Sequence, residues 1–186
     1  MKVYFIGAHS TGKTTCARYV SQKYQLPMIS ETARMVLSEQ ELQIDSLRYD
    51  LDVVDKYQRQ VFNRQLTEEQ KYTSSFVSDR SILDILVYSA QHSRILPELL
   101  ARPETSPYIA DLKLPEVFIL FVRPSKGTLT QDGVRESINW NGIIAIDAQI
   151  KFLLEMFELK YFQVDAESMQ ERTRLIDSVL SLYSFK

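Results

Sequence analysis

A three-layer α/β sandwich built on a five-stranded parallel sheet is the fold that the 186-residue sequence predicts. The first observation behind it is the segment GAHSTGKT at residues 7–14, which fits the pattern G-x-x-x-x-G-K-[ST] between an apolar run and a helical pattern. The second is the alternation of strand-length apolar runs with helical patterns. The third is the continuous apolar character of those runs, clearest in VFILFV at 117–122, which predicts a sheet buried on both faces.

The expected elements follow from these patterns in chain order. A helix should begin after the 7–14 segment, and the last helix should open with the capping box Ser168-x-x-Glu171. The stretch 31–72, which follows the second predicted strand, is predicted to be almost wholly helical. Because ligands of open parallel sheets bind beyond the carboxyl ends of the strands, residues 31–72 are expected to form the wall of an acceptor pocket. The predicted strands are 2–8, 26–30, 75–78, 117–122 and 161–164. Two other amphipathic helices span about 47–66 and 146–157, and the last helix has its apolar face at 175–183.

The 7–14 segment has the chemistry of a phosphate-binding loop. Glycine at positions 7 and 12 lets the backbone curl so that successive N–H groups face a triphosphate, and the following helix directs its positive end at the same place. Lys13 is expected to neutralise the β- and γ-phosphates, and the Thr14 hydroxyl to ligate Mg²⁺. The sequence thus predicts a P-loop NTPase that uses ATP and Mg²⁺. The expected nucleotide-binding residues are Gly7, His9 (through its backbone), Ser10, Thr11, Gly12, Lys13, Thr14 and Thr15.

Composition describes one ordinary globular domain over residues 1–186. A net charge of −2 gives no general attraction to nucleic acid or to an anionic membrane. No signal peptide or membrane-length apolar run is visible, so a cytoplasmic location is expected. The single cysteine, Cys16, excludes an internal disulfide and a multi-cysteine metal site.

Acidic and basic residues follow two of the predicted strands. Glu31 comes directly after the second strand, where it could accept the proton of an acceptor hydroxyl or hold Mg²⁺ through water; the alternative is an acid that complements a helix dipole. Arg34, one turn later, either binds acceptor or phosphate or forms a surface ion pair. Asp79 ends the third strand, where P-loop proteins keep the acid of the Mg²⁺ shell. Arg80 is expected to point into the same cleft and bind substrate or phosphate.

Two further segments carry candidate residues. Three of the five glycines fall near 125–142, which predicts a mobile lid over the phosphates. In this lid, Arg135 is expected to neutralise transition-state charge, and Asp132 to orient it, to cap the next segment or to touch substrate. Gln58, on the long middle helix, is the candidate for hydrogen bonding to a base or amide of the acceptor; a solvated helix face is the alternative reading.

The chain resembles the P-loop kinases of small metabolites, in particular the nicotinamide riboside kinase domain of bacterial NAD-biosynthesis regulators and the related AAA-like ATPase/kinase family. The resemblance covers nearly the whole chain. It rests on GAHSTGKTT, on ETAR at 31–34, on Gln58, on SDR at 78–80 and on QDGVR at 131–135. One departure is Asp79-Arg80-Ser81, which stands where those kinases carry a D-T-D-type sequence. It is more similar to the D-R or E-R-S element of deoxynucleoside and nucleoside monophosphate kinases.

The resemblance implies an ATP-dependent kinase for a nucleoside- or nucleotide-like small molecule. Phage kinases that resemble this family phosphorylate 5-hydroxymethyluracil within DNA, so a hydroxyl in DNA is the alternative acceptor. A regulatory module that binds ATP and hydrolyses it slowly is the third reading. The absence of N-K-x-D and of S-G-G-Q disfavours a GTPase switch and an ABC-type ATPase.

Overall fold

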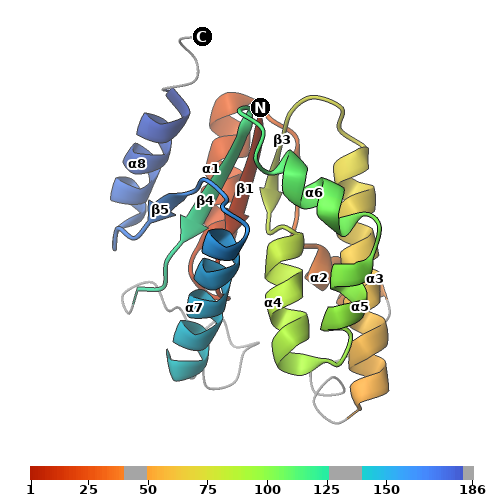
Figure 1. Ribbon diagram of the computed structural model, residues 1–186. Coiled ribbons are helices and arrows are strands. Elements are labelled where there is room, and N and C mark those ends of the chain that lie inside the picture. Colours follow the sequence, from red (N-terminus) through yellow and green to blue (C-terminus); the bar gives the residue numbers. More distant parts are fainter. Residues whose placement is uncertain (40–49, 126–139, 182–186) are drawn as a thin grey trace.

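A five-stranded parallel sheet forms the centre of the structure, a computed structural model that describes residues 1–39, 50–125 and 140–181 (Figure 1). The strand order is β2-β3-β1-β4-β5, so the predicted sheet and its parallel pairing are confirmed. Three of the strands, the first, the second and the last, are shorter than the sequence suggests. The chain leaves the first strand at Gly7, pairs only briefly at the β2 edge, and enters the last strand one residue later than predicted. The strands are β1 (Lys2–Ile6), β2 (Met28–Ile29), β3 (Phe76–Asp79), β4 (Val117–Val122) and β5 (Phe162–Val164).

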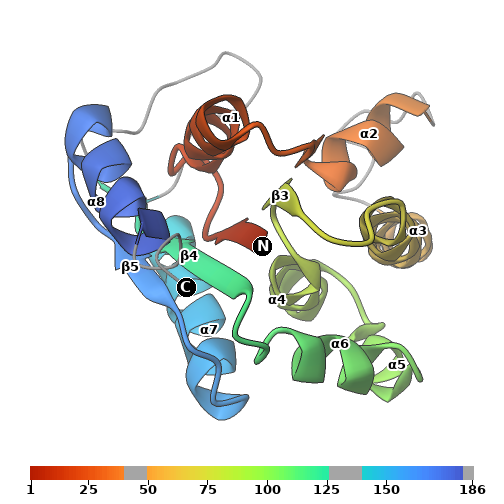
Figure 2. The same cartoon turned by 90° about the horizontal axis from the view of Figure 1, so that it is seen from above.

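Helices cover both faces of this sheet, as Figure 2 shows. One face carries α1 (Lys13–Tyr24) and α8 (Met169–Ser181), and the other carries α3 (Leu51–Gln70), α4 (Ile82–His92) and α7 (Trp140–Met156). The shorter helices α2 (Thr32–Glu39), α5 (Leu96–Ala101) and α6 (Thr105–Asp111) complete the outer side of α3 and α4. None of the helices in the described part of the chain is both long and apolar enough to span a membrane.

Side chains of β1 alternate between two hydrophobic cores, one on each face of the sheet. Val3 and Phe5 pack under α1 and α8, whereas Tyr4 and Ile6 pack under α3, α4 and α7. This alternation follows from the pleat of a strand, and burial on both sides explains the continuous apolar runs. The three-layer fold is therefore the one that the sequence predicts.

The carboxyl ends of β1, β2 and β3 meet at one edge of the sheet. Phe5 is in register with Asp79, and Ile29 with Ser78. The segment that leaves β1 therefore lies beside the residues that leave β2 and β3. This register brings the phosphate-binding loop, Glu31 and Asp79 to the same place.

Asp177 joins α8 to the second half of α1. It accepts hydrogen bonds from the Tyr19 hydroxyl and the Lys23 ammonium, both at 2.6 Å, and from the Tyr24 hydroxyl at 3.0 Å. Burial alone would raise the pKa of Asp177, but the hydrogen bonds from Lys23 and the two tyrosines outweigh it and lower the pKa. A lowered folded-state pKa means that the ionised form stabilises the fold.

We expect Asp177→Asn to lower the free energy of unfolding by about 1–2 kcal/mol near neutral pH, because the amide cannot replace a charged acceptor of three donors. The stability from the ionised carboxylate is fully present above the unfolded-state pKa and is lost as the pH falls through the folded-state value. The difference between the two proteins should therefore narrow below about pH 4. Urea unfolding at both pH values checks this, and an unchanged difference would contradict it.

Candidate functional site

The phosphate-binding loop joins β1 to α1 through several positive-φ residues. Gly7 has a φ of +146°, Ser10 of 59° and Gly12 of +89°. A Cβ on Gly7 would lie 2.4 Å from the carbonyl oxygen of Val122, at the end of the neighbouring strand β4. Glycine is therefore required here by the close approach of β4 as well as by the curl of the loop.

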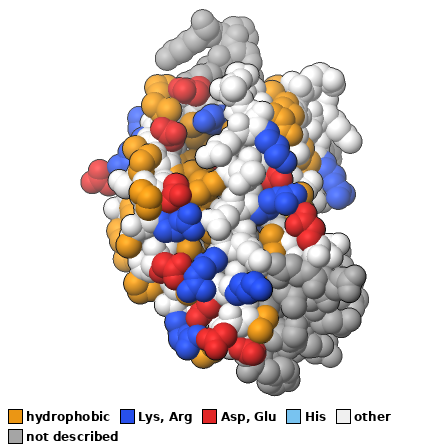
Figure 3. Space-filling model, turned by 90° about the vertical axis from the view of Figure 1, so that its right-hand side faces the viewer, with side chains coloured by type: hydrophobic (Ala, Val, Ile, Leu, Met, Phe, Trp, Pro, Cys, Tyr) orange, Lys and Arg blue, Asp and Glu red, His pale blue; other side chains and the backbone are white. Residues whose placement is uncertain are grey.

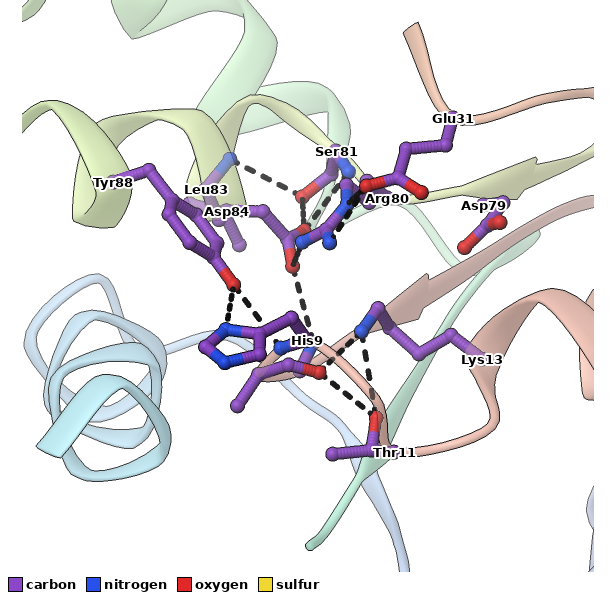
Figure 4. Close-up of polar contacts among 12 residues, drawn as sticks. His9, Thr11, Lys13, Glu31, Asp79, Arg80, Ser81, Leu83, Asp84 and Tyr88 are labelled. Carbon is purple, nitrogen blue, oxygen red and sulfur yellow. Dashed lines mark hydrogen bonds and ion pairs between the residues drawn. The ribbon is translucent and has the colours of Figure 1, made fainter. Parts of the chain in front are cut away.

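Helix α4 braces this loop through two side chains (Figure 4). The backbone N–H of Gly7 donates to Oδ1 of Asp84 at 3.1 Å, and the backbone N–H of His9 donates to the Tyr88 hydroxyl at 3.0 Å. Asp84 also accepts from the backbone N–H of Ser81, closing the capping box that begins α4. The start of the helix and the shape of the loop are thus fixed by the same carboxylate.

Lys13 lies buried under the loop. Its ammonium donates to the carbonyl oxygen of Ala8 at 2.5 Å and lies 3.4 Å from the Thr11 hydroxyl. Burial and the neighbouring Arg80 guanidinium lower the pKa of Lys13 to about 8, although nearby carboxylates act in the opposite direction. An ammonium this poorly solvated gains strongly from an anion beside it.

Thr14 and Asp79, the residues predicted to hold Mg²⁺, contact each other. The Thr14 hydroxyl donates to Oδ2 of Asp79 at 2.5 Å. Oδ1 of Asp79 is buried and has no hydrogen-bond partner among the described residues. Hard oxygen donors suit Mg²⁺, which typically takes one or two protein groups and fills its remaining positions with water and phosphate oxygens. The residues present therefore fit a magnesium ion.

We expect Asp79→Asn to weaken binding of ATP about tenfold when Mg²⁺ is present, a loss of about 1.4 kcal/mol in stabilisation by the ligand. The amide keeps the shape of the carboxylate but not its charge. Thermal unfolding with ATP, in the presence and absence of Mg²⁺, measures the effect, with Asp111→Asn on the exposed end of α6 as the control. Equal gains from ATP in wild type and Asp79→Asn under both conditions would remove Asp79 from the metal shell.

Arg80 and Glu31 form a buried ion pair beside Asp79. Nε and Nη2 of Arg80 lie 2.9 and 2.8 Å from Oε1 of Glu31, and Nε of Arg34 donates to Oε2 at 2.8 Å. Arg80 also lies over the ring of Tyr88, with 5.2 Å between the guanidinium carbon and the ring centroid. Burial alone would lower the pKa of Arg80, but Glu31 and the other anionic neighbours outweigh it and raise the pKa.

The backbone at Arg80 has a φ of 99°, which is unusual for a residue with a side chain. Its N–H still donates to the carbonyl oxygen of Phe5 at 3.0 Å, so the strained residue remains tied to β1. Strain of this kind persists only where the surroundings over-determine it, and it gathers at functional sites. The guanidinium of this residue meets Glu31 at the cavity.

A cavity of about 430 Å³ connects these groups. It extends from the phosphate-binding loop to the side chains around Glu31, with α1 on one side and α2 on the other. Methionine side chains give it an apolar part, and arginine and acidic side chains give it charge. The lining residues are Ser10, Thr11, Gly12, Lys13, Thr14, Thr15, Arg18, Met28, Ser30, Glu31, Arg34, Met35, Asp79 and Arg80.

The remaining candidate residues lie elsewhere. Gly7 and His9 belong to the loop but do not line the cavity. Gln58 is buried against α4, where its side-chain oxygen accepts from the Ser89 hydroxyl at 3.4 Å, so its role toward an acceptor stays a prediction. Asp132 and Arg135, with most of the expected lid at 125–142, lie outside the described residues.

Three residues around the loop were not singled out by the sequence patterns: Asp84, Tyr88 and Arg172. Asp84 had a readable signal, since Ser81-x-x-Asp84 before an apolar run has the form of a capping box. Arg172 stands four residues before the buried Ile176 and so falls on the apolar face of the last helix. Tyr88 had no comparable local signal.

Comparison with known proteins identifies the family. A family model described as an AAA domain matches residues 2–172, and the chain belongs to this family of P-loop domains. The sequence matched none of the curated proteins with which it was compared.

Several solved structures share the fold at low sequence identity. The structure of the NadR protein in complex with NR has a TM-score of 0.75 and 21% identity, covering 97% of this chain and 50% of that chain. The present chain therefore spans about half the length of NadR. Deoxyadenosine kinase from M. mycoides with bound dATP has a TM-score of 0.68 and 17% identity, covering 97% of this chain and 100% of the other. Shikimate kinase from Acinetobacter baumannii in complex with shikimate has a TM-score of 0.54 and 10% identity, covering 97% and 93%.

Proposed function

We propose that this protein is an ATP-dependent kinase that transfers the γ-phosphate of Mg-ATP to a hydroxyl or phosphate of a nucleoside- or nucleotide-like small molecule. The observation that carries the proposal is the cavity that the phosphate-binding loop shares with Glu31, Asp79 and Arg80. A nucleotide hydrolase needs only the loop and the metal site. A carboxylate held by arginines on the far wall of the same cavity supplies the groups that a second substrate requires.

Structural neighbours support an acceptor of this kind. Solved relatives of the fold are kinases of small molecules, among them deoxyadenosine kinase, and NadR was solved with NR and also with NAD and AMP-PNP. The apolar part of the cavity, from Met28 and Met35, suits a flat ring.

Each group has a step in the proposed transfer. The backbone N–H groups of the loop and the Lys13 ammonium hold the β- and γ-phosphates. Thr14 and Asp79 would hold Mg²⁺, which when bound would supply positive charge to neutralise the phosphate oxygens. Arg80 lies where it can meet charge that develops on the migrating group.

Glu31 is assigned to the acceptor. When a hydroxyl oxygen bonds to the γ-phosphorus and the bond to the bridging oxygen of ADP breaks, the hydroxyl proton passes to the Glu31 carboxylate. Arg34 and Arg80 hold that carboxylate in position through both of its oxygens. In this proposal Asp79 holds the metal and Glu31 takes the proton, because Oδ2 of Asp79 contacts Thr14 while its Oδ1 has no hydrogen-bond partner among the described residues.

The outer face of α3 bears on the choice between a small molecule and DNA. Figure 3 shows blue and red side chains interspersed on this face. The ion pairs of α3 include Arg59–Glu98 at 2.7 Å, which reaches α5, and Arg64–Glu68 at 2.7 Å, which lies within the helix. Within the described part of this face, charges of alternating sign form no continuous basic track for a phosphodiester chain, which favours the small-molecule reading.

An acceptor screen tests the proposal. Release of ADP from Mg-ATP is measured with a panel of nucleosides, nucleotides and pyridine ribosides, and with single- and double-stranded DNA containing 5-hydroxymethyluracil. We expect one small molecule to raise ADP release about tenfold or more, since a bound acceptor replaces water at the γ-phosphate. If only DNA stimulates ADP release, the acceptor is a polymer and the small-molecule proposal is wrong. If ADP release is slow and no compound changes it, the protein is an ATP-hydrolysing module and not a kinase.

A further inference from the structure

Arg172, on the first turns of α8, joins three segments of the backbone behind the phosphate-binding loop. The side chain is fully buried. Its Nη1 donates to the carbonyl oxygen of Thr11 in the loop, and its Nε to that of Ala166 before α8, at 2.6 Å. Its Nη2 lies 3.4 Å from the carbonyl oxygen of Arg123, just beyond β4. One guanidinium thus ties the loop to the ends of β4 and β5.

This guanidinium is held by backbone dipoles. No ion pair between Arg172 and a carboxylate is found within the described residues, and burial lowers its pKa. A buried cation is costly unless its donors are satisfied, and here carbonyl oxygens satisfy them. The arrangement places a positive charge against the loop, at a residue that does not line the cavity.

The contact with Thr11 has a consequence for the next peptide group. In a trans peptide unit, the C=O of one residue and the N–H of the following residue point in opposite directions. Holding the Thr11 carbonyl toward Arg172 therefore directs the Gly12 N–H away from it, and Gly12 lines the cavity. A Cβ on Gly12 would lie 3.2 Å from Nη1 of Arg172, so the guanidinium also fills the space that a side chain at this position would need.

We propose that Arg172 is a positioning residue for polyphosphate binding: it orients the Thr11–Gly12 peptide so that the Gly12 N–H faces the phosphates of ATP. The role lies outside the cavity and differs from that of any residue assigned to the transfer itself. It rests on the proposed binding of ATP by the loop, and not on the identity of the acceptor.

Two substitutions at Arg172 and one matched control test this role. Arg172→Lys keeps the charge but can serve fewer of the carbonyls, and Arg172→Gln removes the charge. Asp177→Asn breaks the other tie between α8 and α1, farther along the same helix, without touching the loop. Titration calorimetry with Mg-ATP and with Mg-tripolyphosphate measures binding to the folded proteins, and steady-state kinetics give KM for ATP and for the acceptor found in the screen.

We expect Arg172→Lys to weaken binding of both ligands about tenfold, the loss expected for one misdirected hydrogen bond to a charged group. Its KM for ATP should rise while the KM for the acceptor stays unchanged. Asp177→Asn should lower stability but bind both ligands as wild type does, because a merely structural tie does not orient the loop.

Three results would overturn the proposal. The first is wild-type affinity in Arg172→Lys, and the second is an equal loss in Asp177→Asn, which would point to general loosening of α8. The third is failure of both Arg172 variants to fold, which would make the arginine a requirement of the fold. If the wild-type protein itself binds neither ligand, both the proposed function and the role of Arg172 fail. If the wild-type protein binds both ligands and Arg172→Lys binds them equally well, only the role of Arg172 fails.

Discussion

Lys13→Ala is expected to abolish phosphoryl transfer, lowering kcat/KM by about 10³-fold or more, because it removes the cation that is proposed to hold the β- and γ-phosphates. The structure adds a reason why the fold should tolerate the change. The Lys13 ammonium is buried, its hydrogen bonds among the described residues stay within its own loop, and burial lowers its pKa to about 8. Removing it should leave the melting temperature without ATP nearly unchanged.

Lys23→Ala is the matched control for this substitution. Lys23 lies on the same helix but at its far end, where it pairs with Asp177 at 2.6 Å. Its loss should cost some stability and no activity, the reverse of the result expected for Lys13. Near-normal turnover in Lys13→Ala would show that the 7–14 loop is not the phosphate site.

Glu31→Gln is expected to lower kcat by about 10²-fold or more, the usual contribution of a positioned general base. The amide keeps the size of the side chain, but its single accepting oxygen can serve only one of the two arginines, which donate to different oxygens of the carboxylate. The KM for ATP should change little, because Glu31 is assigned to the acceptor and not to the triphosphate. Initial rates at varied concentrations of each substrate separate these effects.

Glu39→Gln serves as the control, because Glu39 ends the helix that follows Glu31 and forms an exposed ion pair with Arg64. Its kinetic constants should match those of wild type. A kcat for Glu31→Gln within about twofold of wild type would mean that the carboxylate only holds the arginines, since loss of a true base costs far more.

Local patterns made most of the fold and the loop predictable. The segment 7–14 carries its own chemistry, and the continuous apolar runs show a sheet covered on both faces. Glu31, Asp79 and Arg80 could be placed near the loop because residues that follow parallel strands emerge at one edge of the sheet. The structure places all three on the cavity.

Contacts between distant segments were not predictable in the same way. Arg172 reaches Thr11 across 161 positions of the chain, and Asp84 reaches Gly7 across 77. No local pattern encodes which helix end will lie behind a loop. The contact of Gln58 with Ser89 of the neighbouring helix is another example, since the polar face of an amphipathic helix does not show which side chain it will meet; the role of Gln58 toward an acceptor stays a prediction.

The central claim is that the cavity delivers the γ-phosphate to an acceptor and not to water. The most direct measurement follows the reaction in water labelled with oxygen-18, with the acceptor from the screen present, and analyses the phosphorylated products by mass spectrometry. A kinase yields ADP and an equal amount of phosphorylated acceptor that carries no label from water. Release of labelled inorganic phosphate as the main product, with the acceptor unmodified, would contradict the account.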